Sequence, residues 1–223
     1  MSLSSDELKQ AVAKAAVREL TPGMCLGVGT GSTVDFFIDA LGESSLAVRL
    51  AVSSSVRSEQ RLRAHGIQVV SLNAVSEPLD LYVDGADEID GSGFMTKGGG
   101  AALTREKIVA SASKAFLCIV DESKQVKTLG RFPIPIEVIE MAIEPVSRAL
   151  LAMGGQVRLR EGVLTDNGHP ILDVHGLVID DPRAWEDRLN ALPGVVTNGI
   201  FARQGAAKAL VSTQQGVRSI SFG

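Results

Sequence analysis

Cysteine and aromatic residues are scarce in this sequence of 223 residues, which contains two cysteines, one tryptophan and one tyrosine. Two cysteines cannot build a disulfide framework, and both Cys25 and Cys118 lie inside short apolar runs. This placement predicts buried free thiols in a reducing compartment.

Long apolar runs and targeting signals are absent as well. No apolar stretch approaches the roughly 18 residues that a membrane-spanning helix needs. The N-terminal segment MSLSSDELKQ lacks the basic and apolar regions of a secretory signal. We therefore expect a cytoplasmic protein with no membrane partner.

Positive charge is not concentrated in any part of the chain, whose formal net charge is −4. Because binding of nucleic acid requires clustered lysines and arginines, we expect no nucleic-acid partner. An anionic small molecule remains open as a ligand, since a local site can be positive on an acidic protein. The 45% of hydrophobic residues is typical of an ordinary globular protein with a packed core.

Short apolar runs alternate with helical patterns over the first 130 or so residues. Ser4 and Glu7 predict a capping box at the start of a first helix, which ends at Thr21-Pro22-Gly23. Alternation of strands and helices predicts a doubly wound, mostly parallel, Rossmann-like α/β sheet. The expected strands are 24–29, 46–52, 67–72, 79–85 and 115–121, and the expected helices are 33–41, 54–66 and 101–113.

Beyond residue 131 the order of the expected elements becomes βαββαβ, which predicts a smaller ferredoxin-like α+β domain. We expect Asp166-Asn167-Gly168 to be a hairpin turn between its middle strands, and the tail 209–222 to return to the first sheet as two strands. The predicted domains are 1–130 plus 205–223 and 131–204. The expected elements of the second domain are strand 134–139, helix 144–153, strands 156–162 and 171–176, helix 182–192 and strand 195–201.

A glycine-rich segment, residues 27–33 (GVGTGST), joins the first expected strand to a helix. Glycines allow close approach of the backbone, Ser32 and Thr33 carry hydroxyls, and a helix N-terminus presents amides, a combination that suits a phosphate. A tight turn with a serine or threonine cap is the alternative. The segment is not a Walker loop, because no Gly-Lys-Ser/Thr follows. NAD is set aside too, because the spacing is GxGxG and the second strand ends in Ser53-Ser54-Ser55 instead of an acid.

Four acids lie at the end of the most apolar strand: Asp84, Asp87, Glu88 and Asp90. Ligands of open α/β sheets bind beyond the carboxyl ends of the strands, and carboxylates there accept hydrogen bonds from sugar hydroxyls. The spacing does not match a calcium loop. Magnesium held by one or two of these acids and a merely solvated turn stay open as alternatives.

The segment Lys97-Gly98-Gly99-Gly100 precedes a helix that carries Glu106. Amides of consecutive glycines, with a lysine beside them, can face a developing negative charge. The helical neighbours of Glu106 are all apolar, and burial among them would raise its pKa toward neutrality, as a general base for a carbon acid requires. The alternative is a glutamate at the edge of the apolar stripe that reaches water. These neighbours are Ala102, Leu103, Val109 and Ala110.

Two weaker patterns involve Lys124 and the histidines. Lys124 follows the fifth strand, where its ammonium can reach a phosphate, although lysines after strands are usually solvated. One face of a strand would carry His169, Asp173 and His175, a pattern that resembles a metal site. Because Pro170 and the nearby turn make this face irregular, we expect no metal there.

Five segments, in this order, resemble type A ribose-5-phosphate isomerase: GVGTGST, VSSS, YVDGADEID, KGGGAALTREKIVA and DESK. The similarity continues through LTDNGHPILDVHG and LPGVVTNGIF, so it covers essentially the whole chain. The resemblance implies an enzyme of the pentose phosphate pathway that interconverts D-ribose 5-phosphate and D-ribulose 5-phosphate through an enediolate. It implies no metal and no organic cofactor, and a homodimer or homotetramer, since family members are usually dimers or tetramers.

The resemblance also assigns the site residues. It implies that Glu106 is the proton acceptor. The enediolate oxygen needs a compensating positive charge, which Lys97 and the glycine amides can supply, and Asp87 is the candidate for orienting hydroxyls. Asp84 is the candidate for opening the sugar ring. The substrate-binding residues that it implies are Thr30, Gly31, Ser32, Thr33, Asp84, Gly85, Ala86, Asp87, Lys97, Gly98, Gly99, Gly100 and Lys124, with Lys9 as a further phosphate contact.

Two other functions stay open on the sequence. A sugar-phosphate-sensing domain of a transcription regulator has a related fold, but it needs neither Glu106 nor Lys97, and no helix-turn-helix segment is apparent. A coenzyme A transferase uses a glutamate as a covalent nucleophile on a related fold. The segments DGADEID and KGGG argue against that second alternative.

Overall fold

The alternation of strands and helices predicted for the first part of the chain is present in the structure, a computed structural model that describes residues 2–223. The chain forms two units. The first contains the chain up to Ala86, Arg105–Lys124 and Ala206–Gly223, and the second contains Asp87–Thr104 and Gln125–Gly205.

A six-stranded sheet forms the centre of the first unit, with the strand order β13-β12-β6-β3-β1-β2. All neighbouring strands are parallel except β12 and β13, which form an antiparallel hairpin. The sheet confirms the predicted fold class and the return of the tail to it. The strands are β1 (Cys25–Val28), β2 (Leu50–Ser53), β3 (Leu81–Asp84), β6 (Phe116–Asp121), β12 (Lys208–Thr213) and β13 (Gly216–Ser221).

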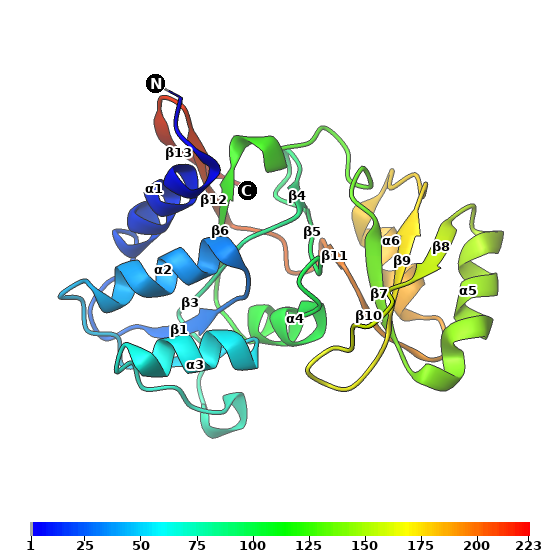
Figure 1. Ribbon diagram of the computed structural model, residues 1–223, viewed down its shortest axis with the longest axis horizontal. Helices are drawn as coiled ribbons and strands as arrows, with labels where there is room; N and C mark the ends of the chain where they lie inside the picture. Colours follow the sequence, from blue (N-terminus) through cyan, green and yellow to red (C-terminus); the bar gives the residue numbers. More distant parts are fainter. Residues whose placement is uncertain (1) are drawn as a thin grey trace. The chain divides into compact units, whose positions relative to one another are not determined.

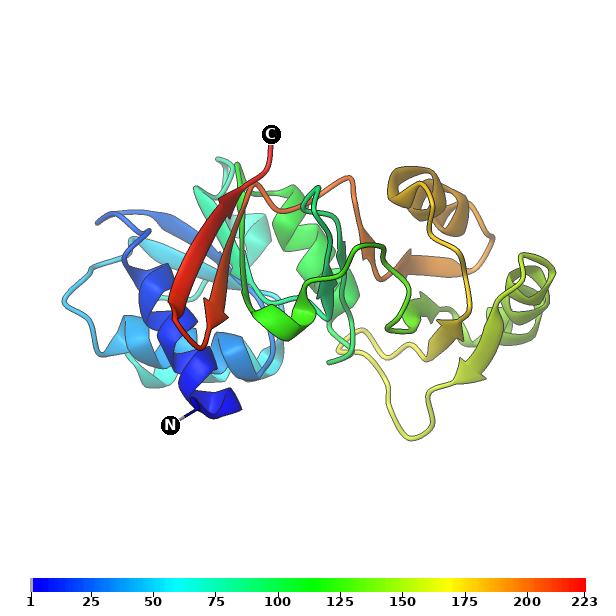
Figure 2. The same cartoon turned by 90° about the horizontal axis from the view of Figure 1, so that it is seen from above.

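Four helices belong to this unit wholly or in part: α1 (Ser5–Val17), α2 (Ser32–Gly42), α3 (Val56–Ala64) and α4 (Leu103–Ser111). The predicted capping box is present, because Ser4 and Glu7 each accept a hydrogen bond from the other's backbone amide. Helix α1 packs beside α2 (Figure 1) and against the β12–β13 hairpin (Figure 2). Its small buried face, Val12, Ala13, Ala15 and Ala16, permits this close packing.

The predicted strand 67–72 is wrong. Only Val69 forms a parallel bridge, to Ala51, and a short 3₁₀ helix (Leu72–Ala74) follows directly. The preceding strand is also shorter than predicted, beginning at Leu50. Before that residue the chain still lies beside the segment that leads into β1, because the carbonyl of Ala47 accepts a hydrogen bond from the amide of Gly23 and the amide of Arg49 donates to the carbonyl of Met24.

The second unit contains a four-stranded antiparallel sheet of order β10-β7-β9-β8. Ile134, Ile136 and Val138 alternate along β7 and share one core with residues of α5 and α6, so both helices cover the same face. The opposite face of β7 carries Pro135 and Glu137. The elements are β7 (Ile134–Val138), α5 (Ile143–Ala152), β8 (Gln156–Leu159), β9 (Ile171–His175), α6 (Pro182–Asn190) and β10 (Val195–Asn198).

The predicted turn at Asp166-Asn167-Gly168 forms between the antiparallel strands β8 and β9, with Gly168 at φ +81°, within a connection over residues 160–170. One predicted detail of this unit is wrong. The predicted strand 195–201 is interrupted at Gly199. A side chain there would lie 2.4 Å from the carbonyl oxygen of Lys97, so the chain at this point has room only for glycine.

After Gly199 the chain enters a different sheet. Strand β11 (Ile200–Phe201) pairs with β5 (Met95–Thr96), which pairs with β4 (Glu88–Ile89). This pairing ties residues 87–104 to the second unit, whereas the predicted division assigned them to the first domain. Cys25 and Cys118 are both buried free thiols, as predicted. Within residues 2–223, no helix is both long enough and apolar enough to cross a membrane.

Candidate active site

The glycine-rich segment after β1 follows the predicted course from strand to helix. Gly31, at φ +122°, is the N-cap of α2 and provides no side-chain hydrogen bond to its first turn. The alternative of a side-chain cap is therefore wrong. Thr30 fixes the segment to neighbouring strands, because its amide donates to Asp84 Oδ1 at 3.1 Å and its hydroxyl lies 2.8 Å from that of Ser54.

Asp84, at the end of β3, is fully buried beside this segment. Its Oδ1 accepts hydrogen bonds from the amides of Thr30 and Gly85, and its Oδ2 accepts one from the Tyr82 hydroxyl at 2.5 Å. A side chain at Gly29 would lie 1.9 Å from Asp84 Cγ, so only glycine lets the backbone pass this carboxylate. The carboxylate is thus held in one orientation.

Tyr82 is the one tyrosine of the chain and is fully buried. Its burial raises its pKa well above the ordinary value, and the negative charges of Asp84 and Glu106 add to this rise. The phenol therefore stays protonated and donates to Asp84. Tyr82 is not among the predicted site residues, although its place two residues before Asp84 on one strand puts both side chains on the same face.

Glu106 lies on α4 and is only 4% exposed. A side chain at Gly27 would lie 2.7 Å from Val109 and 2.8 Å from Tyr82, so this glycine lets α4 pack directly on β1. The contact places Glu106, one helical turn before Val109, where its charge acts on Tyr82. The four predicted apolar neighbours of Glu106 are buried, and the alternative of a solvent-reaching glutamate is wrong.

The four acids at residues 84–90 separate into different roles. In the second unit, Asp87 Oδ2 accepts a hydrogen bond from the amide of Gly99 at 2.8 Å. Glu88 is buried and accepts hydrogen bonds from Thr96 and from the amides of Gly130 and Phe132. Asp90 accepts from the amides of Ser92 and Phe94 and so closes a turn. Glu88 and Asp90 are therefore bonded within the fold.

Lys97 and the three glycines form a loop within the second unit. Lys97 is 3% exposed, and its Nζ lies 5.6 Å from the centroid of the Phe201 ring, a cation–π contact. Its amide donates to the carbonyl of Gly199 at 2.8 Å. Gly98 has φ +105°, and Ala101 has φ +61°, which a residue with a side chain rarely adopts. Gly99 and Gly100 are exposed.

The remaining predicted residues are less enclosed. Lys124 ends a short 3₁₀ helix, Glu122–Lys124, directly after β6 and is half-buried. Lys9, on α1, is also half-buried and forms an ion pair with Asp6 at 3.3 Å.

No group of three potential metal ligands occurs among residues 2–223. Asp173 lies in the histidine-containing pattern that resembles a metal site in the sequence. In the structure it forms a bidentate ion pair with Arg160. Arg160, which is not among the predicted site residues, also contacts the glycine loop.

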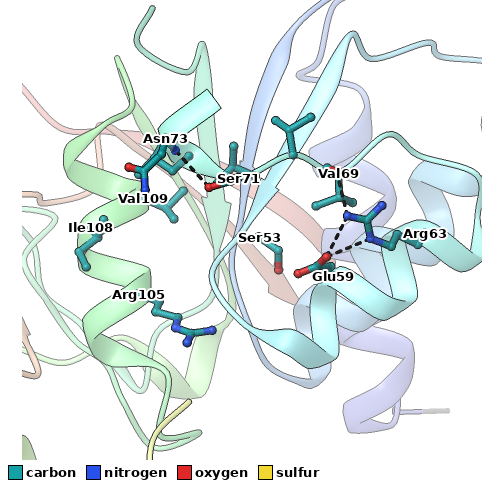
Figure 3. A pocket seen from close by; sticks show the side chains of 12 residues that line it. Ser53, Glu59, Arg63, Val69, Ser71, Asn73, Arg105, Ile108 and Val109 are labelled. Carbon is teal, nitrogen blue, oxygen red and sulfur yellow. Dashed lines mark hydrogen bonds and ion pairs between the residues drawn. The ribbon is translucent and has the colours of Figure 1, made fainter. Parts of the chain in front are cut away.

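A cavity of about 610 Å³ lies in the first unit (Figure 3). Arg105 and Ile108 of α4 line one side of it, and Glu59 and Arg63 of α3 line the other. Arg63 is already bonded to Glu59 and to the carbonyl of Val69. None of the residues that the resemblance assigns to the site lines this cavity.

The fold and these side chains define a class of protein, an α/β protein with buried carboxylates and two glycine-rich loops, one of them at the end of a parallel strand. Comparison with known families narrows this class. Residues 50–216 match the family model of ribose 5-phosphate isomerase A (phosphoriboisomerase A). The chain belongs to this isomerase family.

Solved structures of ribose 5-phosphate isomerases are similar to this chain over its whole length. The chain is 49% identical to ribose 5-phosphate isomerase A from Neisseria gonorrhoeae, with full coverage of both chains and a TM-score of 0.98. It is 42% identical to the enzyme from Methanocaldococcus jannaschii (98% and 100% covered, TM-score 0.92). A third, 38% identical D-ribose-5-phosphate isomerase was solved with phospho-erythronic acid (98% and 100% covered, TM-score 0.94).

Proposed function

We propose that this protein interconverts D-ribose 5-phosphate and D-ribulose 5-phosphate in the pentose phosphate pathway. Full-length similarity to isomerases of this family supports the substrate. The observation that carries the chemistry is Glu106, a carboxylate buried on a helix that packs against the sheet. Aldose–ketose interconversion needs a base of this kind beside a carbon acid.

Glu106 removes the proton from C2 of the open-chain aldose and returns it to C1, while the hydroxyl proton on O2 passes to O1, so that C1 becomes a hydroxymethyl group and C2 the ketone carbon. A positioned base of suitable pKa accelerates such a step by roughly 10²–10⁴. Removal of the proton leaves an enediolate, whose oxygen becomes negative. The ammonium of Lys97 and amides of the loop Gly98–Gly100 stabilise that charge, while the Gly99 amide donates to Asp87. The burial of Lys97 and the exposure of Gly99 and Gly100 support these roles.

Asp84 assists opening of the sugar ring, and Asp87 orients the hydroxyls. The rigid support of Asp84 by two amides and the Tyr82 phenol is consistent with a group that acts in one orientation. The adjoining backbone of Gly85 and Ala86 completes the sugar contacts.

The phosphate binds to residues 30–33 at the start of α2, where no side chain caps the helix. Lys124 and Lys9 add positive charge toward the same group. This remote anchor makes binding energy available to position the carbon centre. No metal or organic cofactor takes part.

We also propose that the protein is a cytoplasmic homodimer or homotetramer and that the second unit makes the subunit contacts. Large apolar side chains are exposed on that unit, with Met141 90% exposed. Such exposure is typical of an interaction surface. The Met141→Asp variant should lower the molar mass measured by light scattering. An unchanged mass would exclude Met141 from the contacts. The other exposed apolar residues of this unit are Ile139, Leu151, Leu159, Leu164, Val178 and Val196.

The decisive experiment compares wild type and Glu106→Gln on ribose 5-phosphate in the presence of EDTA. Because glutamine keeps the shape but cannot accept the proton, we expect kcat to fall at least about 10²-fold with little change in binding of phospho-erythronic acid. Equal loss of binding and turnover would instead make Glu106 structural. A wild type that binds the sugar phosphate without converting it would favour the sensor function.

A further inference from the structure

Arg160, which directly follows β8, connects the four-stranded sheet to the glycine loop. On one side, its Nε and Nη2 donate to the two carboxylate oxygens of Asp173, on β9, at 2.8 and 2.5 Å. On the other side, its Nη1 donates to the carbonyl oxygens of Gly98 at 3.0 Å and Gly99 at 3.3 Å. Both charged side chains are largely buried, with 16% and 19% of their surface exposed.

These contacts determine which way two peptide groups face. The structure contains no cis peptide among residues 2–223, so each carbonyl points opposite to the N–H of the same peptide group. The carbonyls of Gly98 and Gly99 face Arg160. The amides of Gly99 and Gly100 therefore face away from it.

The contact of Gly99 agrees with this reasoning, because its amide donates to Asp87 Oδ2 at 2.8 Å. Arg160 and Asp87 thus hold one peptide group from its two ends. The second peptide group, Gly99–Gly100, is held at its carbonyl end by the same guanidinium. A segment with three glycines has many accessible conformations, so its amides need such support to keep one direction.

We propose that Arg160, held by Asp173, is a positioning residue for the isomerisation: it orients the Gly100 amide toward the oxygen that becomes negative in the enediolate. A positive charge behind the carbonyls also polarises both peptide groups and strengthens their N–H donors. The role is indirect, because Arg160 acts through the backbone that it holds. It rests on the proposed function, since it requires an enediolate.

A role in transition-state stabilisation differs measurably from a role in folding. Loss of a hydrogen-bond donor to the charge that develops in the transition state lowers kcat. Loss of an interaction that is equally strong in the substrate complex and in the transition state raises KM instead. Phospho-erythronic acid is a suitable probe because its carboxylate resembles the planar enediolate. Its affinity should fall in proportion to kcat/KM in a series of variants if Arg160 serves the transition state.

The test compares wild type with Arg160→Gln, Arg160→Lys, Asp173→Asn and the double variant Arg160→Gln/Asp173→Asn. Arg158→Gln is the matched control, because Arg158 is an exposed arginine on β8, two residues before Arg160, and is paired in register with Asp173. Steady-state kinetics on ribose 5-phosphate, inhibition by phospho-erythronic acid and thermal unfolding are measured for each.

We expect Arg160→Gln to lower kcat about tenfold to hundredfold with KM changed less than about threefold, since loss of one direct donor costs about 10²–10³. Arg160→Lys keeps the positive charge but not the planar guanidinium with its several N–H donors, so its kcat should lie between those of Arg160→Gln and wild type. The double variant should be no slower than Arg160→Gln, because both changes remove one support.

Two results would overturn the inference. One is a kcat for Arg160→Gln within twofold of wild type. The other is a loss of activity that follows thermal stability across the series while inhibitor affinity stays constant. Either can occur with an active wild type, which leaves the proposed function intact. An inactive wild type would overturn the proposed function together with this inference.

Discussion

Replacement of Tyr82 by phenylalanine tests whether the buried phenol supports Asp84. The variant keeps the ring, which packs at 71° against Phe116 with the centroids 4.8 Å apart, and removes only the hydroxyl. Asp84 Oδ2 then loses the phenol donor at 2.5 Å, whereas Oδ1 keeps two backbone amides. A hydrogen bond to a charged group contributes about 1.5–3 kcal/mol, so we expect the free energy of unfolding to fall by about 2 kcal/mol.

Thermal unfolding measures this change. For a chain of this length, 1 kcal/mol corresponds to about 2–4 °C, so Tm should fall by about 4–8 °C. Activity should also decline, because the carboxylate proposed to assist ring opening loses one of its supports. A Tm within one degree or so of wild type would refute the reasoning, since it would mean that the phenol contributes nothing to holding Asp84.

The pH dependence of the same residue gives a second test. The pKa of Tyr82 is raised in the folded protein above its ordinary value of 10.0. Above that pH the folded state retains a proton that the unfolded state has lost, so stability falls as pH rises toward the folded pKa. The slope attributable to one group approaches about 1.4 kcal/mol per pH unit. Because Tyr82 is the one tyrosine, near-ultraviolet tyrosinate absorbance should appear only as the protein unfolds. Ionisation while near-ultraviolet dichroism remains native would contradict this.

Two further predictions concern close packing and a buried carboxylate. Gly29→Ala would place a methyl group 1.9 Å from Asp84 Cγ, so we expect a loss of about 1–3 kcal/mol in urea unfolding together with a loss of activity. Gly91→Ala, which meets no atom within 4 Å, is the control and should be nearly neutral. Thr104→Val removes a hydroxyl donor from the fully buried Glu137 and should cost about 1–3 kcal/mol, whereas Thr104→Ser should cost less. A nearly neutral Thr104→Val beside a costly Thr104→Ser would show that the methyl group, not the hydrogen bond, matters.

Much of the fold is predictable because its signals are local. Apolar runs that form buried parallel strands, the capping box at Ser4 and Glu7, and the order of elements in the second unit all depend on residues close together in the chain. The burial of Glu106 is predictable for the same reason, because its helical neighbours decide which face it occupies.

The wrong predictions concern segments whose contact partners are far away in the sequence. The stretch 67–72 has the composition of a strand, yet it lies beside the edge strand β2 and forms one bridge to it before the chain turns into a 3₁₀ helix. The strand predicted at 195–201 is divided because Gly199 lies against Lys97 and Pro135. Neither contact leaves a signal in the local pattern of apolar and polar residues.

By itself, the sequence determined the class of fold, the glycine loops and the set of candidate carboxylates and lysines. Only the tertiary structure decided which of these side chains are buried and which groups they bond to. Asp84, Glu88 and Asp90 look equally suitable in the sequence, but in the structure Asp84 lies beside the glycine-rich segment after β1, whereas Glu88 bonds to the amides of Gly130 and Phe132 and Asp90 closes a turn. Arg160 lies 62 residues from Gly98, and no spacing relates them. The physical reason is that burial and hydrogen-bond partners depend on which distant segments meet, and this is settled only when the whole chain packs.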